Sequence, residues 1–317
     1  MKSTDKEKYI ALCETESTIP VYSRSWWLDT VCGVDNWTVL LVEEKGRIQA
    51  AMPIYSPLRK GITMPPYTQT MGVWFAPFSA DTKYTSALTE RQTICNSLIE
   101  KLSGTSFFLQ NFHHSFTDWL PFYWKGYKQM TRYTYLLPDI SEPTVLWEHM
   151  SSNIRRNINK AGEKNKIGVK RGISVEDFMR IYTKTFERQQ LKTPNAKILE
   201  QLIAVSRERG QGDLWGGYDE KGQLHAVVFV VWQDSSAYYI AGGGDPALRD
   251  SGAHSLVMWE AIQAVSAYTD CFDFEGSMIP GVERFFREFG AVQTPYFTIS
   301  KGKMSLLHRI RMKIQKQ

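Results

Sequence analysis

The spacing of apolar and polar residues is helical in some segments of this chain and strand-like in others. These segments recur in the same order in each half. Residues 37–56 and 212–233 each show two strand-like apolar runs around a Glu-Lys-Gly turn. Glycine in such a turn supplies the positive φ that a tight hairpin needs. A helical pattern precedes each hairpin, near residues 26–32 and 197–209. The recurrence predicts two copies of one α/β unit rather than a solenoid.

The second half alternates helical and strand patterns more clearly than the first. A helix begins after Ser151 or Ser152, and either serine is a suitable N-cap. Strand patterns follow at residues 166–172, 236–244, 271–277 and 294–301, and helical patterns at residues 174–190, 196–209, 253–268 and 280–290. Strands that alternate with helices but include hairpins predict an α/β fold with a mixed, largely antiparallel sheet and helices on both faces.

The length of 317 residues favours two domains. The first half is rich in proline and aromatic residues, notably at residues 64–78. We place the boundary in the stretch LPDISEPTV at residues 137–145, which gives domains at residues 1–142 and 143–300. Residues 301–317 form a basic tail.

Charge is concentrated locally rather than high overall. The net charge of +5 and the pI near 8.8 are milder than is usual for a dedicated nucleic-acid-binding protein. Residues 155–171, however, carry seven Lys and Arg against the single acid Glu163. Like charges four residues apart on a helix cost a few tenths of a kcal/mol each, so a counter-charge is expected. A solvated face, acidic side chains elsewhere and a ligand phosphate all remain open.

Several classes of protein are disfavoured. No apolar run reaches the roughly 18 residues of a membrane span, and the start of the chain does not resemble a signal peptide. The four scattered cysteines are typical of free thiols in a reducing cytoplasm, where we expect the protein. Adjacent histidines such as His113-His114 would face opposite ways on a strand, and no third ligand is near in sequence. Their stretch is more typical of an aromatic loop, so no metal is predicted.

Several short motifs in the second half resemble one known family. The motifs are Tyr238-Tyr239 on a strand, Gly252 before a helix, Asp273-Phe274-Glu275-Gly276, Phe286-Arg287 before Phe289-Gly290, and the basic stretch IRRNINKAGEKNKIGV. Their order and spacing resemble the second domain of the Fem peptidyltransferases and, more broadly, the FemAB-like group of the GNAT acyltransferase superfamily. The resemblance covers about residues 20–300 and implies two tandem GNAT-like (acyl-CoA N-acyltransferase-type) domains.

The resemblance also implies a donor site. GNAT proteins hold a cofactor pyrophosphate at a helix N-terminus, where backbone amides and the helix dipole favour an anion. The corresponding cofactor-binding residues here are Arg249, Ser251, Gly252, Ala253 and His254. His254 occupies a position where the family pattern has Gly or Ala, which weakens the expectation of an acyl-CoA. Fem-like enzymes use an aminoacyl-tRNA instead, so both donors remain open.

The predicted catalytic residues are Asp273, Glu275 and Arg287. Strand alternation would place both carboxylates on one face, where either could accept a proton from an attacking amine. A structural cap or ion pair is the alternative for Asp273. Arg287 stands where Fem ligases have a lysine; because a guanidinium keeps its proton, its role would be to stabilise an anion, unless it is only a surface cation of an amphipathic helix.

Residues expected to bind substrate by the same resemblance are Arg155, Arg156, Arg188, Tyr238, Tyr239 and Phe286. Only one of the two tyrosines is expected to face the cleft, because neighbouring strand residues point to opposite faces. Two departures from the Fem pattern count against a UDP-linked peptidoglycan acceptor. There is no coiled-coil insertion, and Asp29 and Thr30 stand where a first-domain lysine is expected.

The tail at residues 301–317 has apolar residues at helical spacing among lysines and arginines. Such a helix can lie on an anionic membrane or pack on its own domain, so peripheral contact with the inner membrane face is one expectation.

Together these features predict a bacterial, cytoplasmic GNAT/FemAB-like N-acyltransferase without a metal. It would move an acyl or aminoacyl group onto an amine of a small-molecule or lipid-linked cell-envelope precursor, or of an amino sugar, in peptidoglycan or polysaccharide biosynthesis. The alternative is a catalytically silent GNAT-like fold that binds an anionic glycan, nucleotide or RNA.

Overall fold

The structure is a computed structural model that describes residues 4–58, 61–187 and 193–303. The chain divides into two compact units. The first contains the residues up to Arg132 and a segment from Pro295 onward, and the second contains Tyr133–Thr294. The chain passes from one unit to the other within β6 (Lys128–Leu137) and again within β12 (Val292–Gly302). Among the described residues, no helix has both the length and the apolar character needed to cross a membrane.

The first unit is a mixed sheet with four helices among its described residues. Its strands run in the order β1-β2-β3-β5-β12, with β4 paired to β2, and only the β3–β5 pair is parallel. The strands are β1 (Trp37–Glu44), β2 (Arg47–Leu58), β3 (Gly61–Thr63), β4 (Trp74–Phe75) and β5 (Phe107–Phe112). The helices are α1 (Asp5–Thr15), α2 (Ser25–Cys32), α3 (Tyr84–Lys101) and α4 (Leu120–Trp124).

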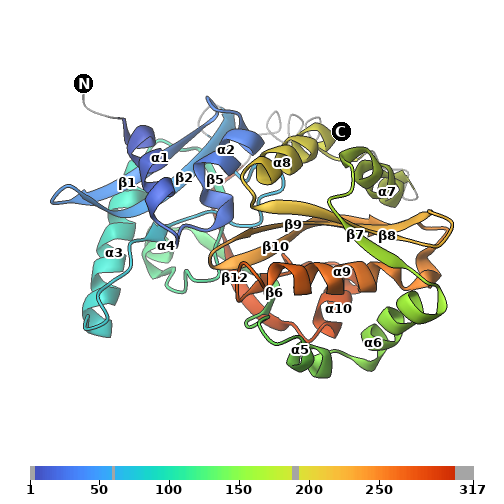
Figure 1. The fold of residues 1–317 in the computed structure, drawn as a ribbon. Coiled ribbons are helices and arrows are strands. Elements are labelled where there is room, and N and C mark those ends of the chain that lie inside the picture. Colours follow the sequence, from blue (N-terminus) through green and yellow to red (C-terminus); the bar gives the residue numbers. More distant parts are fainter. Residues whose placement is uncertain (1–3, 59–60, 188–192, 304–317) are drawn as a thin grey trace. The chain divides into compact units, whose positions relative to one another are not determined.

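The second unit contains a sheet in the order β6-β11-β10-β9-β8-β7, in which β10 and β11 are parallel. Its other strands are β7 (Gly168–Arg171), β8 (Gly212–Tyr218), β9 (Leu224–Gln233), β10 (Ser236–Gly244) and β11 (Phe272–Asp273). Its helices are α5 (Pro143–His149), α6 (Ser152–Asn159), α7 (Val175–Glu187), α8 (Ala196–Glu208), α9 (Ala253–Val265) and α10 (Pro280–Glu288). Helices α7 and α8 cover one face of this sheet, and α9 covers the other (Figure 1).

Burial explains why β9 lies inside this sheet. Every residue of β9 is buried, and its run of valines and aromatics contacts helices on both faces. A strand covered on both faces needs apolar residues at consecutive positions, and β-branched side chains fit the pleated surface. The predicted mixed α/β fold class is confirmed.

Both predicted hairpins and the predicted helices of the second unit are present. The first hairpin joins β1 to β2 through Lys45 and Gly46, both at positive φ, and the second joins β8 to β9. Of the two candidate N-caps, Ser151 caps α6 by accepting a hydrogen bond from the amide of Ile154 at 3.2 Å. Several elements differ from the prediction. The sequence pattern did not predict α1, α3, α4 or α5, and the strand expected at residues 271–277 is only the two-residue β11.

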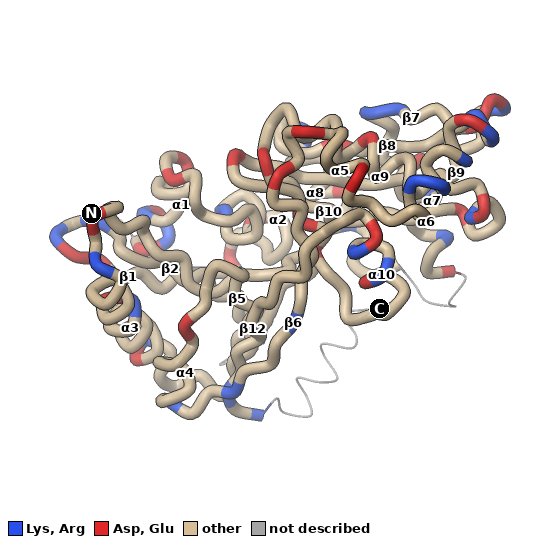
Figure 2. Tube along the Cα trace, turned by 90° about the horizontal axis from the view of Figure 1, so that it is seen from below, with Lys and Arg blue, Asp and Glu red and all other residues tan. Residues whose placement is uncertain are grey.

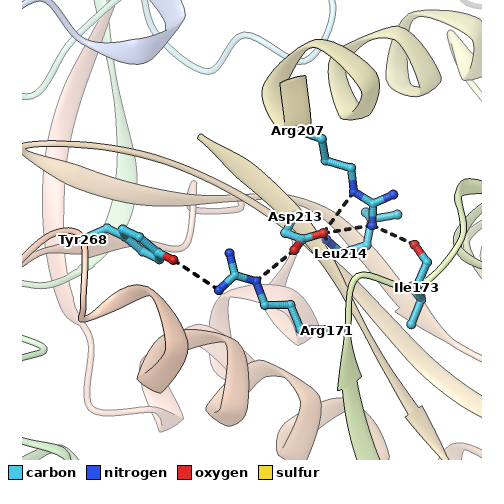
Figure 3. A network of polar contacts seen from close by, with 6 residues as sticks. All are labelled: Arg171, Ile173, Arg207, Asp213, Leu214 and Tyr268. Carbon is cyan, nitrogen blue, oxygen red and sulfur yellow. Dashed lines mark hydrogen bonds and ion pairs between the residues drawn. The ribbon is translucent and has the colours of Figure 1, made fainter. Parts of the chain in front are cut away.

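The edge strand β7 is held by a network around Asp213 (Figure 3). The Asp213 carboxylate accepts hydrogen bonds from Arg171 at 2.9 Å and from Arg207 at 3.0 Å. The Arg171 guanidinium also lies 5.4 Å from the ring centroids of Trp215 and Trp232. Arg171, one cation of the basic stretch, is therefore paired with the acid Asp213. This agrees with the alternative in which acidic side chains elsewhere supply the counter-charge.

Candidate functional site

A cavity of about 800 Å³ lies within the second unit. Its walls come from α6, from the glycine-rich end of β10, from the loop that leads into α9, and from α10. The predicted donor residues Arg249, Ser251, Gly252, Ala253 and His254 all line it. The structure thus brings together all five residues that the family resemblance indicated for the donor.

The start of α9 opens onto this cavity. Gly252 adopts a left-handed conformation with φ of +78°, and a side chain there would overlap the carbonyl oxygen of Asn157 on α6. The Ser251 hydroxyl accepts a hydrogen bond from the amide of Ala253 at 3.2 Å, and the Asn165 amide donates to the Ser251 carbonyl at 2.9 Å. Glycine is therefore required here by the close approach of α6, which holds the positive end of the α9 dipole at the cavity wall.

His254 contributes an imidazole to the cavity lining. Its ring stacks on Phe285, with 5.0 Å between centroids and 14° between planes. Its Nε2 atom is buried and has no hydrogen-bond partner among the described residues. Burial lowers the pKa of His254 to about 4, so the ring is neutral near pH 7. A buried ring nitrogen without a partner costs free energy unless a ligand or water satisfies it.

Aromatic side chains form a further part of the wall. Tyr239 and Phe286 both line the cavity, with ring centroids 6.0 Å apart. The alternation of β10 directs Tyr238 away from it, and Tyr238 is only 3% exposed. A Cβ atom on Gly242 would lie 2.7 Å from the Tyr239 hydroxyl, so glycine makes room for that ring. Burial raises the pKa of Tyr239, which keeps the phenol protonated.

The charged residues of the lining are mixed in sign. Lys160, Arg249 and Arg284 supply positive charge, while Asp250 and Glu288 supply negative charge. Arg284 donates to Glu288 at 2.7 Å, so part of its charge is balanced. The Arg249 side chain is 72% exposed and Lys160 is half-buried, and both are placed where a ligand phosphate would be favoured.

The two predicted carboxylates lie outside this lining. Asp273 is 2% exposed and accepts hydrogen bonds from the Thr134 hydroxyl and, at 2.7 Å, from the Glu275 amide. Because β11 ends at Asp273 and Glu275 has φ of +62°, strand alternation does not place the two side chains on one face. Burial raises the pKa of Asp273 to about 6 and that of Glu275 well above its ordinary value. Their catalytic role stays a prediction.

The predicted arginines are also dispersed. Arg287 is 60% exposed and donates to Glu283 at 2.8 Å, and it does not line the cavity. Arg156 donates to Asn153 at 2.8 Å, and Arg155 lies on the same helix outside the lining. Arg188 lies outside the described residues.

Several lining residues were not singled out from the sequence. They include Asn153, Asn157, Thr185, His225 and Phe285. His225 is 8% exposed, and its Nε2 lies 3.3 Å from Asp219. His225 lies beside an ordinary hairpin turn, and nothing in the sequence marked it as a site residue. Among the described residues no group of three or more His, Cys, Asp or Glu side chains is arranged to hold a metal ion.

Comparison with known proteins places this cavity inside a recognised domain. Residues 148–287 match the family model described as an acetyltransferase (GNAT) domain. No protein of curated function matches the chain in sequence.

Solved structures share the fold of the chain over nearly its whole length. FemX is similar with a TM-score of 0.65 and 14% identity, over 100% of this chain and 99% of that one. L-PGS from Bacillus licheniformis is similar with a TM-score of 0.55 and 9% identity, over 99% and 98% of the two chains. The C-terminal domain of a putative lysylphosphatidylglycerol synthetase from Agrobacterium fabrum has a TM-score of 0.56 and 8% identity, over 92% and 91%.

These likenesses agree with the predicted mixed α/β fold. All residues that line the cavity except Glu288 lie within the segment that the family model matches. Residues 148–287 thus match the acetyltransferase (GNAT) domain family, and the chain as a whole shares its fold with FemX.

Proposed function

We propose that the second unit transfers an acyl or aminoacyl group to an amine, with the phosphates of the donor held at the start of α9. The observation that carries this proposal is the cavity itself, which joins a helix N-terminus to Lys160 and Arg249 within the GNAT domain. Oriented amides and cations together favour an anionic ligand. An acyl-CoA and an aminoacyl-tRNA both carry phosphate and an activated acyl group in one molecule.

Tyr239 is the group in the lining best suited to proton transfer. Attack by a neutral amine on the donor carbonyl forms a C–N bond, and the leaving sulfur or oxygen must then gain a proton. The Tyr239 phenol is protonated near pH 7, because its ordinary pKa is about 10 and burial raises that pKa further. Its ring centroid lies 6.0 Å from that of Phe286 in the cavity wall. It would donate that proton. The proton lost by the amine would pass through water to Asp273 or Glu275, neither of which lines the cavity.

The acceptor proposed is an amine of a cell-envelope precursor or an amino sugar. FemX and L-PGS are among the proteins that share the fold, which supports a cell-envelope acceptor. The competing proposal is a catalytically silent fold that binds an anionic glycan, nucleotide or RNA. It is favoured by His254, which lines the cavity where the family pattern has Gly or Ala, and by the ion pair of Arg287 with Glu283.

The test measures transfer from radiolabelled acetyl-CoA, and separately from charged tRNA, to amino sugars and to lipid-linked amine precursors. Transfer that falls at least about tenfold in kcat with Tyr239→Phe, with KM little changed, is expected for a proton donor. The matched control is Tyr84→Phe, a 77% exposed tyrosine on α3 that should leave both constants unchanged. Saturable donor binding without transfer to any acceptor would instead favour the silent binding fold.

A further inference from the structure

Helix α4 in the first unit presents large side chains to solvent in an unusual way. Leu120, Tyr123 and Trp124 are 43%, 58% and 57% exposed, whereas Phe122 between them is fully buried. In this five-residue helix, Phe122 packs in the core while three large side chains are exposed to solvent. Exposed apolar residues that occur singly are ordinary, but three on one turn indicate a contact surface.

Basic side chains adjoin these residues. Lys125 and Lys128 follow α4 directly and are exposed, and Lys301 and Lys303 are exposed at the end of β12. Figure 2 shows Lys and Arg positions gathered near α4 and at the end of the described chain. Residues 119–132 and 295–303 together contain no Asp or Glu.

One contact joins the aromatic and basic parts into a single surface. The Lys301 ammonium donates to the carbonyl of Lys125 at 2.7 Å and lies 4.8 Å from the ring centroid of Tyr127. The end of β12 is therefore held against the residue that follows α4. We call the residues Leu120, Tyr123, Trp124, Lys125, Lys301 and Lys303 the α4 surface.

We propose that the α4 surface docks on an anionic lipid bilayer. Trp and Tyr rings are amphipathic and prefer the boundary between lipid headgroups and hydrocarbon. Lysines immediately beside them are attracted by the negative potential of such a membrane. A protein partner would need an apolar patch surrounded by acidic side chains. An anionic bilayer has both an apolar interior and negatively charged headgroups.

The α4 surface shares only Lys301 and Lys303 with the basic tail predicted at residues 301–317, and residues 304–317 lie outside the described residues. Stable attachment of a peripheral protein generally takes two weak membrane signals rather than one. The α4 surface would provide one of them whether or not the tail provides the other. It also does not depend on the transferase activity of the second unit.

The test is co-sedimentation of the full chain with vesicles of phosphatidylcholine alone or of phosphatidylcholine with phosphatidylglycerol. We expect binding only to the anionic vesicles, weakening as salt is raised. Trp124→Ala should lower the partition coefficient about tenfold, the equivalent of 1.4 kcal/mol. The paired change Lys301→Ser and Lys303→Ser should lower it by a similar factor. Val34→Ala, at an exposed apolar residue of the same unit outside the α4 surface, is the control and should have no effect.

A second full-chain variant separates this surface from the tail. Changing Arg309, Arg311 and Lys313 to serine removes tail charge, and the effect of Trp124→Ala should persist in that background. Thermal unfolding of each variant checks that the fold is retained. Equal binding to both vesicle types, or a partition coefficient that Trp124→Ala leaves unchanged, would overturn the proposal. So would self-association that Trp124→Ala abolishes in the absence of any vesicle binding.

Discussion

Gly252 shows how one residue can serve packing and a ligand site together. The sequence marked it through a family pattern for phosphate binding, and the structure shows that the Asn157 carbonyl occupies the space of a side chain. Asn157 and Gly252 both line the cavity. The spacing of residues along the chain carries no information on the approach of α6, because that contact joins segments far apart in sequence.

Gly252→Ala should therefore destabilise the second unit. The substitution places a Cβ against backbone and demands a φ of +78° from an L-residue, so we expect a loss of about 2 kcal/mol or more in the free energy of unfolding. Gly281→Ala is the control, since that glycine also lines the cavity but nothing lies within 4 Å of its Cβ position. Denaturant titration measures both. Equal stability of the two variants would contradict the packing role of Gly252.

Asp273 yields a prediction about pH. Its pKa in the folded protein is raised from 3.8 to about 6, because burial disfavours the ionised carboxylate. The folded state therefore keeps a proton that the unfolded state loses, and stability falls as pH rises from about 4 to about 6. Asn has no proton to lose and retains an oxygen acceptor for Thr134 and Glu275.

We expect Asp273→Asn to be more stable than the natural protein by about 2 kcal/mol near pH 7, with the difference much smaller near pH 4. Urea unfolding at the two pH values measures it. A variant less stable than the natural protein at both would show that the ionised carboxylate itself stabilises the fold.

At the scale of elements, the strongest periodic patterns gave the most reliable predictions. The hairpins, α6 with its serine cap, α9 and α10 were all expected, because their apolar spacing and end signals agree. Helix α3 was missed because its buried residues, from Ile94 to Ile99, occupy only its second half. Strand β11 was predicted too long, since its actual length depends on pairing with β6 and β10 rather than on its own residues.

The edge strand β7 offers a test at this scale. Arg171→Met should cost about 1 kcal/mol of unfolding free energy, because it removes an ion pair to Asp213 and the charge that faces Trp215 and Trp232. The control is Arg180→Met, which breaks an exposed ion pair with Asp177 within one helix and should cost less than about 0.5 kcal/mol. Thermal unfolding of both compares them. A larger loss for Arg180→Met would show that the aromatic contacts of Arg171 contribute little.

At the scale of the molecule, the mixed α/β class follows from the order of helical and strand patterns. The order of these patterns does not predict that β12 returns to the first unit. Its residues 297–302 pair with β5, almost two hundred positions earlier in the chain. The candidate site, like the fold, was predicted only in part. Motif residues around α9 were found, whereas Asp273 and Arg287 lie outside the cavity because folding gives them partners that spacing alone cannot reveal.

The central claim is that the cavity at the start of α9 binds the phosphates of an acyl donor. The most direct measurement is a calorimetric titration of the full chain with acetyl-CoA and, in parallel, with aminoacylated tRNA. We expect saturable binding of one donor. The paired change Lys160→Gln and Arg249→Gln should weaken that binding about tenfold or more. The same change at the exposed Lys128 and Lys303 of the first unit should have no effect on it. Failure of both donors to bind, or binding that does not respond to Lys160 and Arg249, would contradict the claim.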